Sequence, residues 1–116
     1  MKMEILNKSG NFDAKEIFKV LNGSCETLKQ NAGSKFDVCG YMLVEKENAD
    51  GEPTRVLFIK ATTGVIFSGS SATARGDFEA MVAAFGEPTD ENPIRDVVIV
   101  EKPTNKGRTC LRLDIG

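Results

Sequence analysis

The predicted order of secondary-structure elements between Phe36 and Ile115 constrains the fold of this 116-residue chain more than any other feature. Apolar and polar residues alternate in several short segments, which is the period of a half-buried strand. The pattern predicts five strands near residues 35–46, 55–60, 65–68, 97–100 and 108–115. A helix that begins at Ser70 or Ser71 follows the third strand, because apolar residues recur there at helical spacing as far as Phe85.

A second helix is predicted near the N-terminus, over residues 13–22, after a short strand over residues 2–8. Asp13 is a suitable N-cap, Glu16 completes a capping box, and Gly23 can end the helix in the left-handed conformation. Gly40 interrupts the first predicted strand of the five. We expect a bulge or sharp bend at Gly40, because the first strand of a small barrel pairs with both halves of the sheet.

The predicted fold class is therefore mainly β: an OB-like five-stranded Greek-key barrel with a helix between strands 3 and 4 and an extra N-terminal helix. The length fits a single domain over residues 1–116. Apolar runs are only a few residues long, and no long apolar segment follows Met1. We therefore expect neither a membrane span nor a signal peptide, and we place the protein in the cytoplasm.

The residue types present argue against catalysis and metal binding. The chain has no histidine, which removes the commonest general base and rules out Ser-His-Asp and Cys-His sites within the chain. Cys25, Cys39 and Cys110 are odd in number, widely spaced and form no CxxC pair, so we expect free thiols. The sequence predicts a protein that is not an enzyme and that holds no metal and no cofactor.

Basic residues gather in the last predicted hairpin. The net charge is −2, so a site for a polyanion must come from local clustering. Lys102, Lys106, Arg108 and Arg112 fall on or beside this hairpin, at spacings that suit a phosphate backbone. A solvated edge strand that is charged to prevent aggregation is the alternative, and charge alone favours it slightly.

Two aromatic residues and one polar segment are further candidates. Tyr41 falls in the row opposite to Phe36 and Val38, so we expect its ring on the open face, where it can stack on a base for about 1–3 kcal/mol. A half-buried tyrosine whose hydroxyl reaches water is an equal alternative. Phe67 is a second stacking candidate, for which core packing is the stronger alternative. Residues 68–71 are interpreted first as a helix cap and second as a phosphate contact.

The chain resembles the single-stranded DNA-binding proteins of φ29-type Bacillus phages and related phages of Gram-positive hosts. The stretches that carry this resemblance are residues 13–23, 26–29, 64–73 and 104–115. The family pattern has tyrosine where this chain has Phe67, and an aromatic residue near Val44 rather than at Tyr41, whereas Lys106 and Gly107 match its last hairpin. The resemblance implies an OB-type fold and sequence-independent binding of single-stranded DNA during phage DNA replication.

The leading hypothesis is a module that binds single-stranded DNA, protects it and unwinds its hairpins, in the host cytoplasm if a phage encodes it. The expected contacts are Lys35, Tyr41, Arg55, Lys60, Phe67, Lys106, Arg108 and Arg112. The expected partners are single-stranded DNA and phage replication proteins, and we expect a monomer rather than a stable oligomer. The alternative hypothesis is a protein-interaction module of a mobile element, such as an inhibitor of a host enzyme, whose acidic loop at Asp90 and Glu91 imitates nucleic acid.

Overall fold

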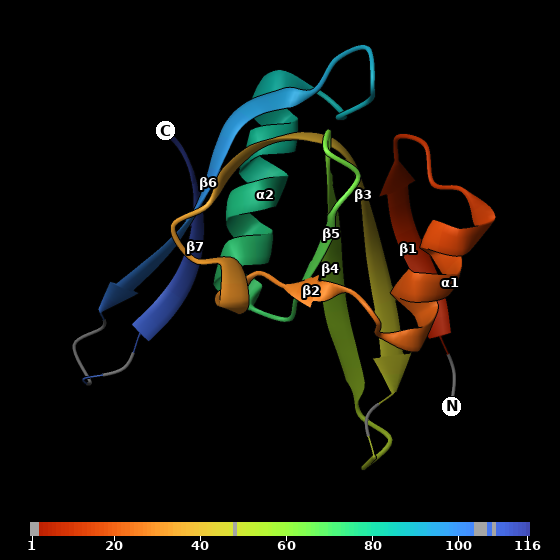
Figure 1. Cartoon of the computed structure of the whole chain (residues 1–116). Helices are drawn as coiled ribbons and strands as arrows, with labels where there is room; N and C mark the ends of the chain where they lie inside the picture. Colours follow the sequence, from red (N-terminus) through yellow and green to blue (C-terminus); the bar gives the residue numbers. More distant parts are fainter. Residues whose placement is uncertain (1–2, 48, 104–106, 108) are drawn as a thin grey trace.

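The alternating segments form one curled, mixed sheet, and two helices pack against it (Figure 1). The computed structural model describes residues 3–47, 49–103, 107 and 109–116. The strands in this part of the chain are β1 (Met3–Ser9), β2 (Glu26–Thr27), β3 (Lys35–Glu47), β4 (Pro53–Ala61), β5 (Ile66–Gly69), β6 (Ile94–Pro103) and β7 (Thr109–Ile115). The helices are α1 (Ala14–Asn22) and α2 (Ala72–Phe85), with a short 3-10 turn, η1 (Lys29–Asn31). The predicted order of strands and helices, and a mainly β class, are confirmed.

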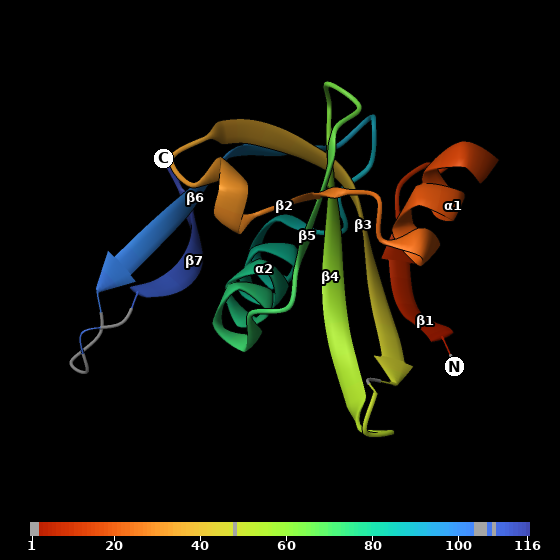
Figure 2. The same ribbon diagram turned by 60° about the horizontal axis from the view of Figure 1, so that its bottom comes forward.

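The sheet turns around β3. One edge of β3 pairs with β4 from Val38 onward, whereas the other edge pairs first with β6, over residues 35–38, and then with β1. The pairing register of β3 with β4 shifts between Val38 and Gly40, which confirms the bulge expected there. The strands follow the order β2-β5-β4-β3-β6-β7, and among the described residues β5 and β7 do not pair. The sheet is therefore a half-barrel whose two arms stand apart, as Figure 2 shows.

The bulge also changes which side chains of β3 face inward. A strict period of two would place Met42 on the same face as Phe36 and Val38. Instead, Val38 and Tyr41 share the inner core, and Met42 packs in a separate cluster on the outer face. One extra residue in a strand moves every later side chain to the opposite face. The prediction that Tyr41 lies opposite to Phe36 and Val38 is therefore wrong.

Two apolar cores hold the half-barrel. The inner core lies between the sheet and α2, which contributes the buried side chains of Ala74, Phe78 and Met81. The outer core lies between α1 and the outer face of β3 and β4. It contains Phe12, Val20, Met42, Val44, Val56, Phe58 and Ile66. The two helices therefore cover opposite faces of the curved sheet.

The helix ends form as their sequence signals predict. The Asp13 carboxylate accepts a hydrogen bond from the Glu16 amide at 2.8 Å, and the Glu16 carboxylate accepts one from the Asp13 amide at 3.0 Å. Gly23 ends α1 with a φ of 75°, which favours glycine. Ser71 caps α2 by accepting a hydrogen bond from the Ala74 amide at 3.2 Å. The capping box, the glycine end of α1 and the serine cap of α2 are all confirmed.

Candidate nucleic-acid interface

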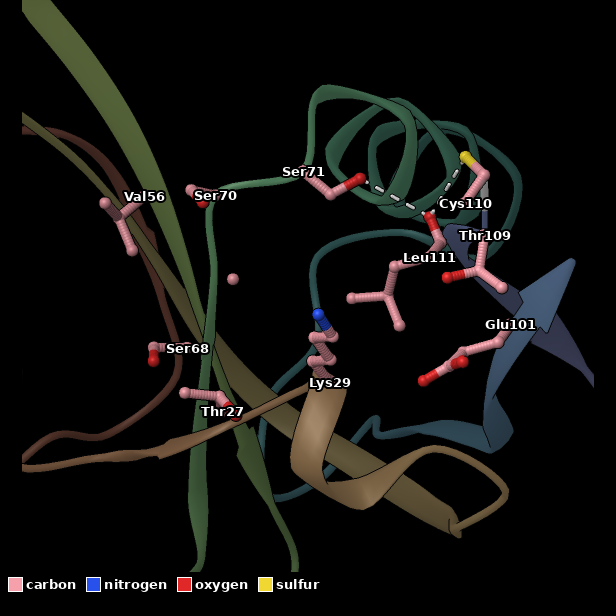
Figure 3. Close-up of a pocket in the computed structure, with 11 residues that line it drawn as sticks. Thr27, Lys29, Val56, Ser68, Ser70, Ser71, Glu101, Thr109, Cys110 and Leu111 are labelled. Carbon is pink, nitrogen blue, oxygen red and sulfur yellow. Dashed lines mark hydrogen bonds between the residues drawn. The ribbon is translucent and has the colours of Figure 1, made fainter. Parts of the chain in front are cut away.

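A groove lies in the seam where the two arms of the half-barrel do not meet, and Figure 3 shows its lining. Its volume is about 740 Å³. The residues that line it come from β2, η1 and the β4–β5 arm on one side, and from β6 and β7 on the other: Thr27, Lys29, Val56, Ser68, Gly69, Ser70, Ser71, Glu101, Thr109, Cys110 and Leu111. Parts of the chain that are far apart in sequence therefore line the same groove.

A side-chain hydrogen bond crosses the seam. The Ser71 hydroxyl donates to the Leu111 carbonyl of β7 at 3.4 Å and also accepts the capping bond from α2. On the β2–β5 side of the groove, Leu28 packs directly over Gly69, where a Cβ atom would lie 2.6 Å from the leucine Cδ1. The Leu28 amide also donates to the Ser68 carbonyl at 2.8 Å. These contacts hold the β2–β5 wall of the groove and link it to β7.

Hydroxyl groups dominate the polar part of the lining. Thr27, Ser68, Ser70 and Thr109 line the groove together with Ser71. Hydroxyl groups and backbone amides are common donors to phosphate oxygens in protein–DNA complexes. Ser68 and Ser71 already donate to the Glu26 and Leu111 carbonyls, so the hydroxyl groups left to donate to an anionic backbone are those of Thr27, Ser70 and Thr109. The lining also contains residues 68–71, which the sequence indicates second as a phosphate contact.

Two opposite charges face each other across the groove. Lys29 extends into it from η1, and Glu101 extends into it from β6 (Figure 3). Within the described ranges, no carboxylate lies close enough to Lys29 to form an ion pair. Lys29 is thus available to a phosphate, whereas Glu101 would repel one.

Tyr41 was expected to be an exposed stacking ring, and this expectation is wrong. The residue is only 5% exposed, and its ring meets Phe78 of α2 edge-on with centroids 5.1 Å apart. Its hydroxyl donates to the Glu87 carboxylate at 3.4 Å. Burial, reinforced by Glu87, raises the pKa of Tyr41 to about 12. The ring belongs to the inner core, so no base can stack on it in this conformation.

Phe67 is also part of the inner core. It is 7% exposed and stacks on Phe36 with ring centroids 4.7 Å apart. The expectation that Phe67 offers a ring to a base is therefore wrong, and the alternative of core packing is confirmed. The bulge of β3 and the pairing of β5 with β4 explain both burials, because they turn these two rings toward α2.

Lys60 was expected to contact DNA, but its ammonium group is occupied on the outer side of the sheet. It donates to the Asn11 carbonyl at 2.7 Å and to the Glu16 carboxylate at 3.0 Å. It also lies 5.5 Å from the centroid of the Phe12 ring, within cation–π range. Lys60 therefore attaches α1 to the sheet, and the expectation that it lines an open trough is wrong.

The other predicted cations are not gathered at one site. Arg112 forms two hydrogen bonds of 2.8 Å with the carboxylate of Asp77 on α2, which lowers the pKa of that carboxyl. Arg55 lies 3.5 Å from Glu45 on the neighbouring strand, and Lys35 is exposed at the start of β3. None of these three cations lines the groove. Lys106 and Arg108, also predicted contacts, lie outside the described residues, so their DNA-binding role stays a prediction.

The sequence interpretation missed Lys29, Thr27 and Thr109. These residues have no shared motif, and only the curvature of the sheet brings them together. Pairing of β2 with β5 places Thr27 beside Ser68, and η1 follows directly. The only signal in the sequence was the predicted open barrel itself, which implies that some residues must line its unclosed side.

All three cysteines are free thiols, and burial raises the pKa of both Cys25 and Cys39. No cluster of three or more potential metal ligands occurs in the described ranges. No described helix combines the length and apolar character needed to cross a membrane. Comparison of the chain with protein-family models, curated proteins and solved structures finds no match.

Proposed function

We propose that this protein is an OB-like module that binds single-stranded DNA without sequence preference in the groove between its two arms. The observation that carries the proposal is the position of that groove. OB folds bind oligonucleotides along their second and third strands and beside the loop that joins the last two. Counted from β3, the second and third strands are β4 and β5, which contribute Val56 and Ser68, and the last connection runs between β6 and β7.

The lining supports contact with the sugar-phosphate backbone rather than with base edges. Lys29 supplies a positive charge, and the hydroxyl groups supply hydrogen-bond donors. Such contacts occur at every nucleotide, so affinity depends little on base sequence. A protein that binds only the unpaired strand also shifts hairpins toward the open form by mass action. Protection and unwinding of single strands follow from the same contacts.

A protein-interaction module is the second candidate, and one observation favours it. Among the described strands, β7 pairs only with β6, so an extended peptide can add to its other edge once the Ser71 and Asp77 side chains leave the Leu111 carbonyl and the Leu113 amide. The acidic loop is less free to imitate nucleic acid, since Asp90 accepts a hydrogen bond from Asn11 at 2.9 Å and Glu87 accepts one from Tyr41. Absence of any binding to oligonucleotides would favour this candidate over the first.

Titration of fluorescent oligo(dT) by anisotropy at two salt concentrations tests the proposal. The wild type should bind, and the logarithm of its affinity should fall with log salt at a slope of about −0.7 per phosphate neutralised. Lys29→Ala should weaken binding and reduce that slope by about 0.7. Arg95→Ala is the matched control, because Arg95 is exposed beyond the far end of α2 from the groove.

Salt-dependent binding that Lys29→Ala weakens and Arg95→Ala preserves supports the proposal. Binding that is indifferent to salt, that requires duplex DNA, or that Arg95→Ala weakens as much as Lys29→Ala would overturn the assignment of the groove.

A further inference from the structure

Outside the groove, α1 exposes an unusual aromatic side chain. Phe18 is 65% exposed, the highest value for any aromatic residue in the described ranges. It lies along a shallow hollow of about 450 Å³, lined by Ala14, Lys15, Phe18, Lys19, Asn22 and Ser24. The opposite face of the helix buries Val20 in the outer core. The ring of Phe18 thus contributes nothing to that core and is open to a ligand.

Two ammonium groups flank this ring. Lys15 precedes Phe18 by one helical turn and Lys19 follows it directly, and both are exposed. In the part of the chain that the structure describes, neither lysine forms an ion pair. An aromatic face between cations is the combination that holds single-stranded nucleic acid, because the ring stacks on a base while the cations contact phosphates. The two lysines would repel a cationic ligand, and a purely apolar ligand would offer them no partner.

The hollow and the groove share no lining residue, but they are close together along the chain. Ser24 lines the hollow and Thr27 lines the groove, and β2 runs between α1 and η1 (Figure 1). Three extended residues span at most roughly 10 Å. A nucleic-acid strand that leaves the groove past Thr27 can therefore reach Phe18 within a few nucleotides.

We propose that the hollow formed by Lys15, Phe18 and Lys19 on α1 is a second contact site for the same strand of DNA. The strand crosses β2 from the groove, stacks one base on Phe18 and places phosphates beside the two lysines. This inference rests on the proposed function. It adds an aromatic contact that the groove lacks, and it makes affinity depend on the length of the strand.

A length series of oligo(dT), from about 4 to about 24 nucleotides, tests the second site. Phe18→Ala should leave the affinity for the shortest bound oligomers unchanged and should weaken binding of long ones by about 5- to 150-fold, the range expected for loss of one stacked base. Phe18→Tyr, which keeps the ring, should bind long oligomers like the wild type. Lys15→Ala/Lys19→Ala should reduce the salt slope by about 1.4 for long oligomers only.

The control is Phe85→Ala, since Phe85 is 55% exposed at the end of α2 that lies away from the groove. This variant should bind both short and long oligomers with the affinity of the wild type. If Lys29→Ala weakens binding while Phe18→Ala behaves like Phe85→Ala at every length, the second site is overturned and the groove stands. If the wild type binds no oligomer of any length, the proposed function itself has failed.

Discussion

Lys60 illustrates, at the scale of single residues, how a charge can serve the fold rather than a ligand. Its ammonium group meets the Glu16 carboxylate, and the same carboxylate closes the N-cap of α1. We expect Lys60→Met to destabilise the protein by about 1–3 kcal/mol, because it removes the hydrogen bonds of a charged side chain that is only 15% exposed. Urea denaturation measures this loss.

The matched control for Lys60→Met is Lys35→Met, which removes an exposed charge and should change stability by no more than about 0.5 kcal/mol. Oligo(dT) affinity should not differ between folded Lys60→Met and the wild type. Equal stability of the two variants, or lost DNA binding by folded Lys60→Met alone, would contradict the structural role of Lys60.

Tyr41 gives a prediction about alkaline pH. Its pKa is raised to about 12 in the folded protein, whereas an unfolded tyrosine titrates near 10. Between these values the unfolded chain loses the proton first, so stability falls as pH rises. Once the pH exceeds both pKa values, the difference of about two pKa units lowers the free energy of unfolding by about 2–3 kcal/mol.

Tyr41→Phe removes this titration. Relative to its own stability at pH 9, the variant should lose less stability than the wild type up to pH 12, as followed by denaturant unfolding at each pH. Parallel stability curves for the two proteins would show that the Tyr41 hydroxyl is not buried as described.

At the scale of elements, the bend of β3 depends on the lack of a side chain at Gly40. A Cβ atom there would lie 2.9 Å from the Ser9 carbonyl oxygen and 3.2 Å from the Phe12 ring. We expect Gly40→Ala to cost about 1–3 kcal/mol, because the backbone of β1 must move to admit it. Thermal and urea unfolding both measure this cost.

Gly76→Ala is the contrasting change in a second element. Gly76 lies within α2, and a Cβ atom there would meet nothing within 4 Å. Alanine should therefore stabilise the helix by about 0.5–1 kcal/mol. If Gly40→Ala stabilised the protein as Gly76→Ala should, the close approach of β1 to β3 would be refuted.

The elements also show where prediction from sequence succeeds. The caps at Asp13 and Ser71 and the alternation in the strands are local signals, so helices and strands could be placed from the sequence. The bulge at Gly40 could be expected as well, but its effect on Tyr41 requires the count of residues in the bulge, which only pairing with β4 determines. The groove could not be predicted residue by residue, because only the curvature of the whole sheet brings Lys29 and Thr109 to the same groove.

At the scale of the whole molecule, the groove combines favourable and unfavourable charges for a polyanion. Glu101 faces the position that a phosphate would occupy, opposite Lys29. We expect Glu101→Gln to raise oligo(dT) affinity by about two- to fivefold at low salt, with a smaller gain at high salt because ions screen the repulsion. Glu91→Gln, in the loop beyond the far end of α2, should leave affinity unchanged.

The same molecular architecture explains why the predicted cations disperse. α1 on the outer face occupies Lys60, and α2 on the inner face occupies Arg112 through Asp77. In both cases a basic side chain of the sheet pairs with a carboxylate of the helix and attaches that helix to the sheet. Lys29 is the basic residue in the described lining of the groove. Hydroxyl groups therefore make up the larger part of the proposed contact.

Mapping the bound strand on the protein tests the central claim most directly. Two-dimensional heteronuclear NMR would follow the backbone amides as oligo(dT) of about 12 nucleotides is added. We predict that the largest shifts occur at Thr27, Lys29, Ser70 and Thr109, on both walls of the groove. Shifts confined to the loop over residues 86–93, or no shifts at saturating oligonucleotide, would contradict the account.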